Sequence, residues 1–162
     1  MAREITLNKK HLKYAGLLIA LLLCVVAIDV FADQNAREAS KAATESVTEL
    51  FSVDLRRDVA GQLPPCTETG RAFWAMHLAS IKDAAKARDV TVLSVKAERN
   101  GSPEPYKGIG GEGQIVPVKL TITSQGTGGR AETSESRVRV LMIKGEGDEW
   151  LLDGLAVQLP SR

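Results

Sequence analysis

The side chains that could do chemistry are few, and they do not form a recognised catalytic pattern. His77 is the only histidine after residue 32. Nucleophilic catalysis would require a Ser or Cys beside it and an acid to orient its ring. His77 lies one helical turn from Phe73 and Ile81, so we expect a histidine at the edge of the core. If it faces a cavity instead, it is a candidate ligand contact.

The carboxylates are numerous, but their spacing matches no acid–base pair. Most lie in polar or turn-like sequence, where we expect solvated surface: Glu132, Glu135, Glu146, Asp148 and Glu149. Asp153 differs, because it follows Trp150-Leu-Leu and is a candidate buried polar group inside the sheet. Trp150 is expected to pack in the core. His77, Trp150 and Asp153 are therefore the candidate pocket residues, and we expect no catalytic residue, cofactor or metal ligand.

Gly108-Ile-Gly-Gly-Glu-Gly113 formally matches GxGxxG. A dinucleotide site needs such glycines after a strand and before a helix, so that the helix N–H groups meet the pyrophosphate. Here the motif precedes a strand-like sequence, so we predict a loop instead.

The two cysteines do not form a disulfide framework. Cys24 lies in an apolar segment and Cys66 lies outside it, and an intramolecular disulfide needs both side chains in one place. Cys66 is interpreted as a buried thiol, with an intermolecular bridge as the alternative. The net charge of +1 and the 4% aromatic content give no sign of a nucleic-acid interface.

Residues 14–32 (YAGLLIALLLCVVAIDVFA) carry no charge before Asp29. A membrane-spanning helix needs roughly 20 residues, so we expect a transmembrane helix here. The positively charged flank, Arg3 to Lys13, predicts a cytoplasmic N-terminus (1–13) and an extracytoplasmic domain (33–162) at the cell membrane. The expected membrane-facing residues are Tyr14, Leu17, Leu18, Ile19, Leu21, Leu22, Leu23, Val25, Val26 and Ile28.

A cleaved signal peptide is the alternative. The segment has a basic start, an apolar centre and a small-residue pattern, Val30-Phe31-Ala32, at which cleavage could occur. Both interpretations export the rest of the chain.

Two amphipathic helices are expected next. From Asp33 to about Ala60, apolar residues recur at helical spacing, and no Gly or Pro lies between Gly16 and Gly61. We therefore predict one helix continuous with the apolar segment. Its alanine-rich stripe indicates packing on a sheet or, alternatively, helix pairing in a homo-oligomer. A second helix begins at Thr67 or Thr69.

Four strands are predicted after the helices, at 90–98, 114–124, 131–144 and 149–159. Their alternation of apolar and polar residues is typical of an antiparallel sheet with one buried face. Pro117 cannot donate to a sheet, so we expect an edge strand or a bulge there. The 99–113 link is expected to be a loop. The fold class is α+β: two to three helices on a curved four-stranded antiparallel sheet, in a cone-shaped domain.

This layout resembles the Mce-associated membrane proteins of actinobacteria. The resemblance rests on the basic tail, the apolar segment, the alanine-rich helix, Thr67-Glu-Thr-Gly-Arg-Ala-Phe-Trp74 and the Trp150-Leu-Leu-Asp-Gly-Leu155 ending. It is also similar to other single-pass proteins with a nuclear-transport-factor-two-like domain, including a core component of type IV secretion. The resemblance implies no catalytic residues.

The resemblance implies a non-enzymatic accessory protein of an envelope transport complex, with Mce-type lipid import as the first hypothesis. Its partners would be the membrane and other subunits of that complex. Conjugative type IV secretion is the second hypothesis. A small-ligand binder or enzyme that uses the concave sheet face is the third, and a filled apolar interior would count against it.

Overall fold

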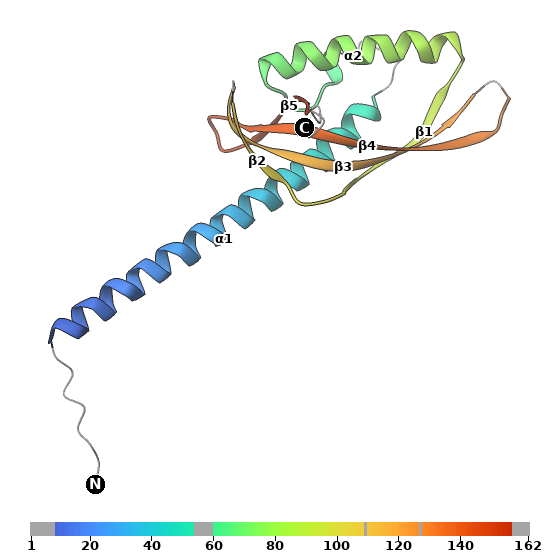
Figure 1. Ribbon diagram of the computed structural model, residues 1–162. Coiled ribbons are helices and arrows are strands. Elements are labelled where there is room, and N and C mark those ends of the chain that lie inside the picture. The colour runs from blue at the N-terminus through green and yellow to red at the C-terminus, as the bar shows by residue number, and fades with distance from the viewer. Residues whose placement is uncertain (1–8, 54–59, 109, 127, 157–162) are drawn as a thin grey trace, which may run out of the picture. The chain divides into compact units, whose positions relative to one another are not determined.

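The computed structural model describes residues 9–53, 60–108, 110–126 and 128–156, and side-chain surroundings from residue 30 onward (Figure 1). The chain divides into two compact units, Met1–Asn35 and Ala36–Arg162. The elements, in chain order, are α1 (Lys9–Phe51), η1 (Ala60–Gln62), α2 (Glu68–Ala87), β1 (Thr91–Arg99), β2 (Glu104–Gly108), β3 (Gly111–Gln125), β4 (Ala131–Lys144) and β5 (Trp150–Leu155).

The first unit contains the start of α1, and the prediction of an uninterrupted helix as far as Phe51 is confirmed. The prediction of a transmembrane helix at 14–32 is wrong. Among the described residues, no helix is long and apolar enough to cross a membrane. From Val30 onward α1 is rich in charged and hydroxyl side chains, which lowers its hydropathy. Tyr14 to Ile28 lie on α1, before the part of the chain whose side-chain surroundings the structure describes, so the expected membrane-facing side chains stay a prediction.

The second unit contains one antiparallel sheet of five strands, in the order β1-β3-β4-β5, with β2 also paired to β3. The prediction of four strands is therefore wrong. The additional strand is β2, in the link expected to be a loop. It pairs with the start of β3 from Glu104↔Ile115 to Gly108↔Gly111. Its short polar sequence shows no alternation, so nothing in the local pattern indicates a strand.

The GxGxxG match is part of this β2–β3 hairpin and does not begin a helix. Gly110 has φ of 102° and Gly111 has φ of 121°, a conformation that side-chain-bearing residues rarely adopt. Gly110 and Gly111 therefore serve the tight turn between β2 and β3, within the link where a loop was predicted.

Pro117 lies on the central strand β3, so the expectation of an edge strand or bulge is wrong. On one side it pairs with Arg139 of β4. On the other side of β3, pairing with β2 stops at Ile115 (opposite Glu104) and pairing with β1 starts at Val118 (opposite Arg99). The Pro117 carbonyl accepts from the Asn100 N–H there, at 2.9 Å. N and O of a strand residue point to the same side, so the missing N–H falls at the junction between two neighbouring strands and costs the sheet little.

Both helices contribute to one core on the apolar face of the sheet. Trp74 and Leu78 of α2 are each 1% exposed. Figure 1 shows α2 along this face. The other buried members come from α1, from the residues just after it and from the strands: Ala39, Ala43, Val47, Leu50, Val53, Val116, Val118, Leu120, Val140, Met142 and Leu152. The apolar residues that alternate along the strands are therefore on the buried face of the sheet, as predicted.

The predicted alanine-rich stripe of α1 packs in this core. Ala39, Ala43, Val47 and Leu50 recur every three or four residues, which places them on one helix face, and all are fully buried. Small side chains at Ala39 and Ala43 let the helix backbone lie close to its neighbours. Of the two interpretations of the stripe, packing within the chain is confirmed.

The first turn of α2 lies against the backbone of β5. A Cβ atom on Gly70 would stand 2.3 Å from the Leu152 carbonyl oxygen and 2.7 Å from that of Asp153. Glycine is therefore required for this close approach. The contact fixes the start of the second helix on the last strand.

We expect Gly70→Ala to destabilise the fold by about 2 kcal/mol, because overpacking forces backbone shifts of that cost. Gly126→Ala is the matched control, since a Cβ atom there meets no atom within 4 Å. Urea unfolding of the full chain, followed by the fluorescence of the buried Trp74, compares the two. Equal stability of the variants would contradict the close approach of α2 and β5.

Candidate functional site

His77 lies at the edge of the core, as predicted, on the exposed side of α2. Its ring stacks on Phe73, with centroids 5.9 Å apart and planes 6° apart. It also meets the edge of Trp74 at 5.8 Å. The ring therefore completes an aromatic cluster with Phe73 and Trp74 on the helix surface.

Trp150 and Asp153 are both on β5, but they have different structural roles. Trp150 is half-buried and packs against the core, and the Lys144 Nζ lies 6.0 Å from its ring centroid. The Asp153 carboxylate accepts a short hydrogen bond from the Thr67 hydroxyl. Asp153 is therefore a partly buried structural group. None of the three candidate pocket residues lines the groove of Thr44, Glu45, Thr48, Glu49 and Ala97 that is described below.

Thr67 links the start of α2 to β5 through several hydrogen bonds. Its hydroxyl accepts from the Gly70 N–H at 2.9 Å while donating to Asp153. Its own N–H donates to the Leu152 carbonyl at 3.2 Å, and the Leu152 N–H donates to the Pro65 carbonyl at 3.0 Å. The predicted N-cap at Thr67 is confirmed. The partnership with Asp153 was not predicted, because the two residues are far apart in sequence.

We expect Thr67→Val to cost about 1–2 kcal/mol of stability, since it removes the cap and leaves the Asp153 carboxylate without this donor. Thr67→Ser keeps the hydroxyl and is expected to recover most of the loss. Chemical unfolding at neutral pH measures both. If the two variants are equally destabilised, the hydroxyl is not the stabilising group.

Cys66 is a free, half-buried thiol that packs against the core. Burial raises its pKa; the Arg71 guanidinium opposes this, and Glu49 and Asp153 add to it. A raised pKa keeps the sulfur protonated at neutral pH, and the thiol is a far weaker nucleophile than the thiolate. Cys66 is thus suited to packing rather than to covalent chemistry.

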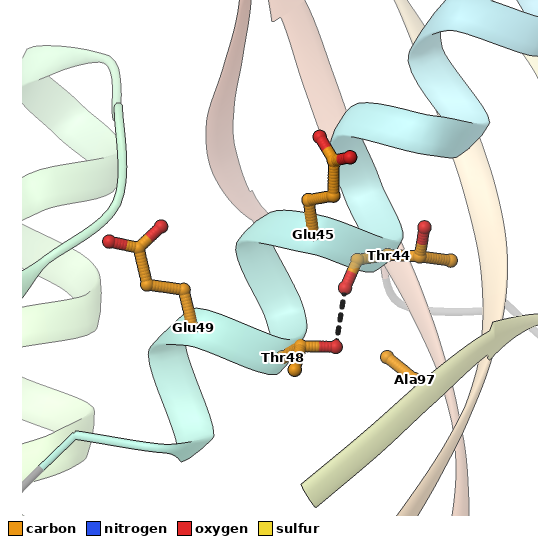
Figure 2. Close-up of a pocket in the computed structure, with 5 residues that line it drawn as sticks. All are labelled: Thr44, Glu45, Thr48, Glu49 and Ala97. Carbon is orange, nitrogen blue, oxygen red and sulfur yellow. Dashed lines mark hydrogen bonds between the residues drawn. The ribbon is translucent and has the colours of Figure 1, made fainter.

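An open groove of about 420 Å³ lies between α1 and β1, lined by Thr44, Glu45, Thr48, Glu49 and Ala97 (Figure 2). The threonine hydroxyls donate to helix carbonyls, Thr48 to Thr44 O at 2.7 Å and Thr44 to Lys41 O at 2.9 Å. The glutamates are exposed, and Glu45 has a 4.0 Å contact with Lys41. The groove is a shallow acidic surface. Sequence analysis did not predict it, because its residues are far apart in the sequence and come together only when α1 packs beside β1.

Strand β1 forms the border of this groove and one edge of the sheet. Among the described residues it pairs only with β3. Its outer surface carries an ion pair, Lys96 Nζ to Glu98 Oε1 at 2.7 Å. The hydrogen bond and charge of Lys96 lower the pKa of Glu98, with a smaller contribution from Lys119. The lowered pKa keeps the Glu98 carboxylate ionised at neutral pH, beside the Lys96 side chain that pairs with it.

Within the residues that the structure describes, no group of His, Cys, Asp and Glu is placed to hold a metal ion. The chemistry available at the surfaces above is hydrogen bonding, ion pairing and backbone strand pairing. Each of these suits a contact with another polypeptide.

Comparison with known protein families gives no match. Comparison with curated protein sequences gives no match either.

Proposed function

We propose that this chain is a non-enzymatic accessory protein of an envelope transport complex, in which residues 36–156 act through protein–protein contacts. Mce-type lipid import is the system that the layout of the sequence favours. The resemblance in the helix start at Thr67 and in the Trp150–Leu155 ending supports this choice.

The observation that carries the proposal is the filled interior of the second unit. In a domain of this layout a ligand would enter between the helices and the apolar face of the sheet. That space is taken by Leu50, Trp74, Leu78, Met142 and Leu152, each 0–1% exposed. Interiors are close-packed, and a bound molecule would have to displace these side chains. The groove beside Ala97 and the β1 edge lie on the outside of this core, where a protein partner has access to them.

Location at a cell membrane is part of the proposal, and it rests on the resemblance to subunits of membrane transport complexes. In this account, the folded part works outside the cytoplasm, beside the membrane-bound subunits of the complex.

Deleting the gene in the source organism tests the proposal. We expect several-fold lower uptake of a radiolabelled fatty acid or sterol and lower amounts of the transporter's other subunits, because an accessory protein stabilises its complex. Wild-type complementation should restore both. Complementation with Gly126→Ala, which leaves the fold intact, should restore them equally.

Unchanged lipid uptake in the deletion strain would contradict lipid import. A fall in conjugation frequency, with lipid uptake intact, would assign the chain to secretion instead.

A further inference from the structure

We propose that the β1 edge is a self-association surface, at which two copies of this chain pair their β1 strands antiparallel about a two-fold axis through Ala97. The inference does not depend on the transport assignment. It rests on the direction of the backbone groups of β1, on its charge pattern and on the state of the opposite edge of the sheet.

The hydrogen bond from Asn100 N–H to Pro117 O fixes which backbone groups of β1 face β3. Residues that exchange hydrogen bonds with the neighbouring strand alternate along an antiparallel pair. In the observed register, Lys96 (opposite Thr121) and Glu98 (opposite Lys119) are four and two residues before Asn100. Because the hydrogen-bonded positions recur every second residue, the backbone groups of Lys96 and Glu98 also point at β3. The N–H and C=O groups of Val95, Ala97 and Arg99 therefore point away from the sheet.

These outward groups suit a second copy in one register. With Ala97 opposite Ala97 of the other copy, Val95 stands opposite Arg99, and all of these residues can exchange backbone hydrogen bonds. A two-fold axis perpendicular to the sheet lies between two copies of one residue, and Ala97 is the middle one of the outward set. An axis at Lys96 or at Glu98 would place two like charges directly opposite each other. Pairing between two copies satisfies both edges and leaves a closed dimer.

The charges of β1 are self-complementary in this register. Lys96 of each copy stands opposite Glu98 of the other, at a position without backbone hydrogen bonds, where facing side chains are closest. The existing Lys96–Glu98 pairs, 2.7 Å within each copy, join into a square of alternating charge. Centring the axis on Val95 or Arg99 would place Lys96 opposite serine, and no charge would be matched.

The opposite edge of the sheet, at β5, is less open to pairing than β1. The opposite edge, β5, already carries the 65–67 segment, through a Cys66↔Leu152 bridge and the bonds at Pro65 and Thr67. A bulge between Val92 and Ser94 ends the regular part of β1 on one side. The groove beside Ala97 leaves space next to the edge for the core-side side chains of the second copy.

Sedimentation velocity of the purified full chain in a non-ionic detergent, over a range of protein concentration, tests the proposal. We expect a dimer for the wild type. Lys96→Glu and Glu98→Lys should each weaken it about tenfold or more, because both cross-strand pairs become like-charged. Mixing the two variants should restore a heterodimer, and the double variant K96E/E98K should again form a homodimer.

Lys107→Glu is the matched control: Lys107 forms an equally exposed ion pair with Glu112, at 3.1 Å, on another strand. It should dimerise like the wild type. Circular dichroism confirms that each variant is folded. The proposal would be overturned if the wild type is monomeric, or if the Lys96 and Glu98 variants dimerise as strongly as the wild type. If neither the mixture of single variants nor the double variant forms a dimer, the proposed register with Ala97 opposite Ala97 is wrong. A negative result here would leave the lipid-uptake experiment unaffected.

Discussion

The packing of α1 against the apolar face of the sheet is the contact on which the rest of the second unit depends. Ala39, Ala43, Val47 and Leu50 form a narrow stripe that is fully removed from solvent. The hydrophobic effect gives about 25 cal/mol for each Å² of apolar surface buried, and a sheet with one bare face could not be stable alone. The stripe closes the core over β3 and β4, and α2 adds Trp74 and Leu78.

The polar residues of the same helix accommodate this close packing. Ser40, Thr44, Thr48 and Ser52 each donate a hydroxyl hydrogen bond to a carbonyl one turn earlier. A hydroxyl satisfied in this way can lie beside apolar neighbours without losing a partner. Ser40 and Ser46 are nearly as buried as the alanines. The helix therefore remains compact on its core side, and its longer charged residues, such as Glu45 and Glu49, line the outer groove.

Much of this fold could be predicted from the sequence, because its main signals are periodic. The 3.6-residue period of α1 and α2 and the alternation in β3 and β4 gave the element types, the buried face and the Thr67 cap. β2 could not be predicted, because its pairing with β3 depends on a glycine turn rather than on its own side chains. The prediction of an edge strand or bulge at Pro117 was wrong. The sequence shows that proline has no N–H to donate, but it does not show that two neighbouring strands meet beside this residue.

The surfaces proposed for binding depend even more on three-dimensional contact. The α1–β1 groove and the outward backbone of Val95, Ala97 and Arg99 follow from register, which the sequence of β1 alone does not specify. The candidate residues His77, Trp150 and Asp153 were selected for their chemistry. In the fold, His77 belongs to an aromatic cluster, Trp150 packs against the core, and Asp153 accepts a hydrogen bond from Thr67, the cap of α2. Their placement fits a chain that works through its outer surface.

Hydrogen exchange of the native full chain, resolved by residue, tests the central role of α1 most directly. If the stripe closes the core, the amides of Ala39 to Leu50 exchange as slowly as those of Val116 to Leu120 in β3, because both open only when the second unit unfolds. Fast exchange across Ala39 to Leu50, with β3 still protected, would show that the sheet is stable without α1 and would contradict this account.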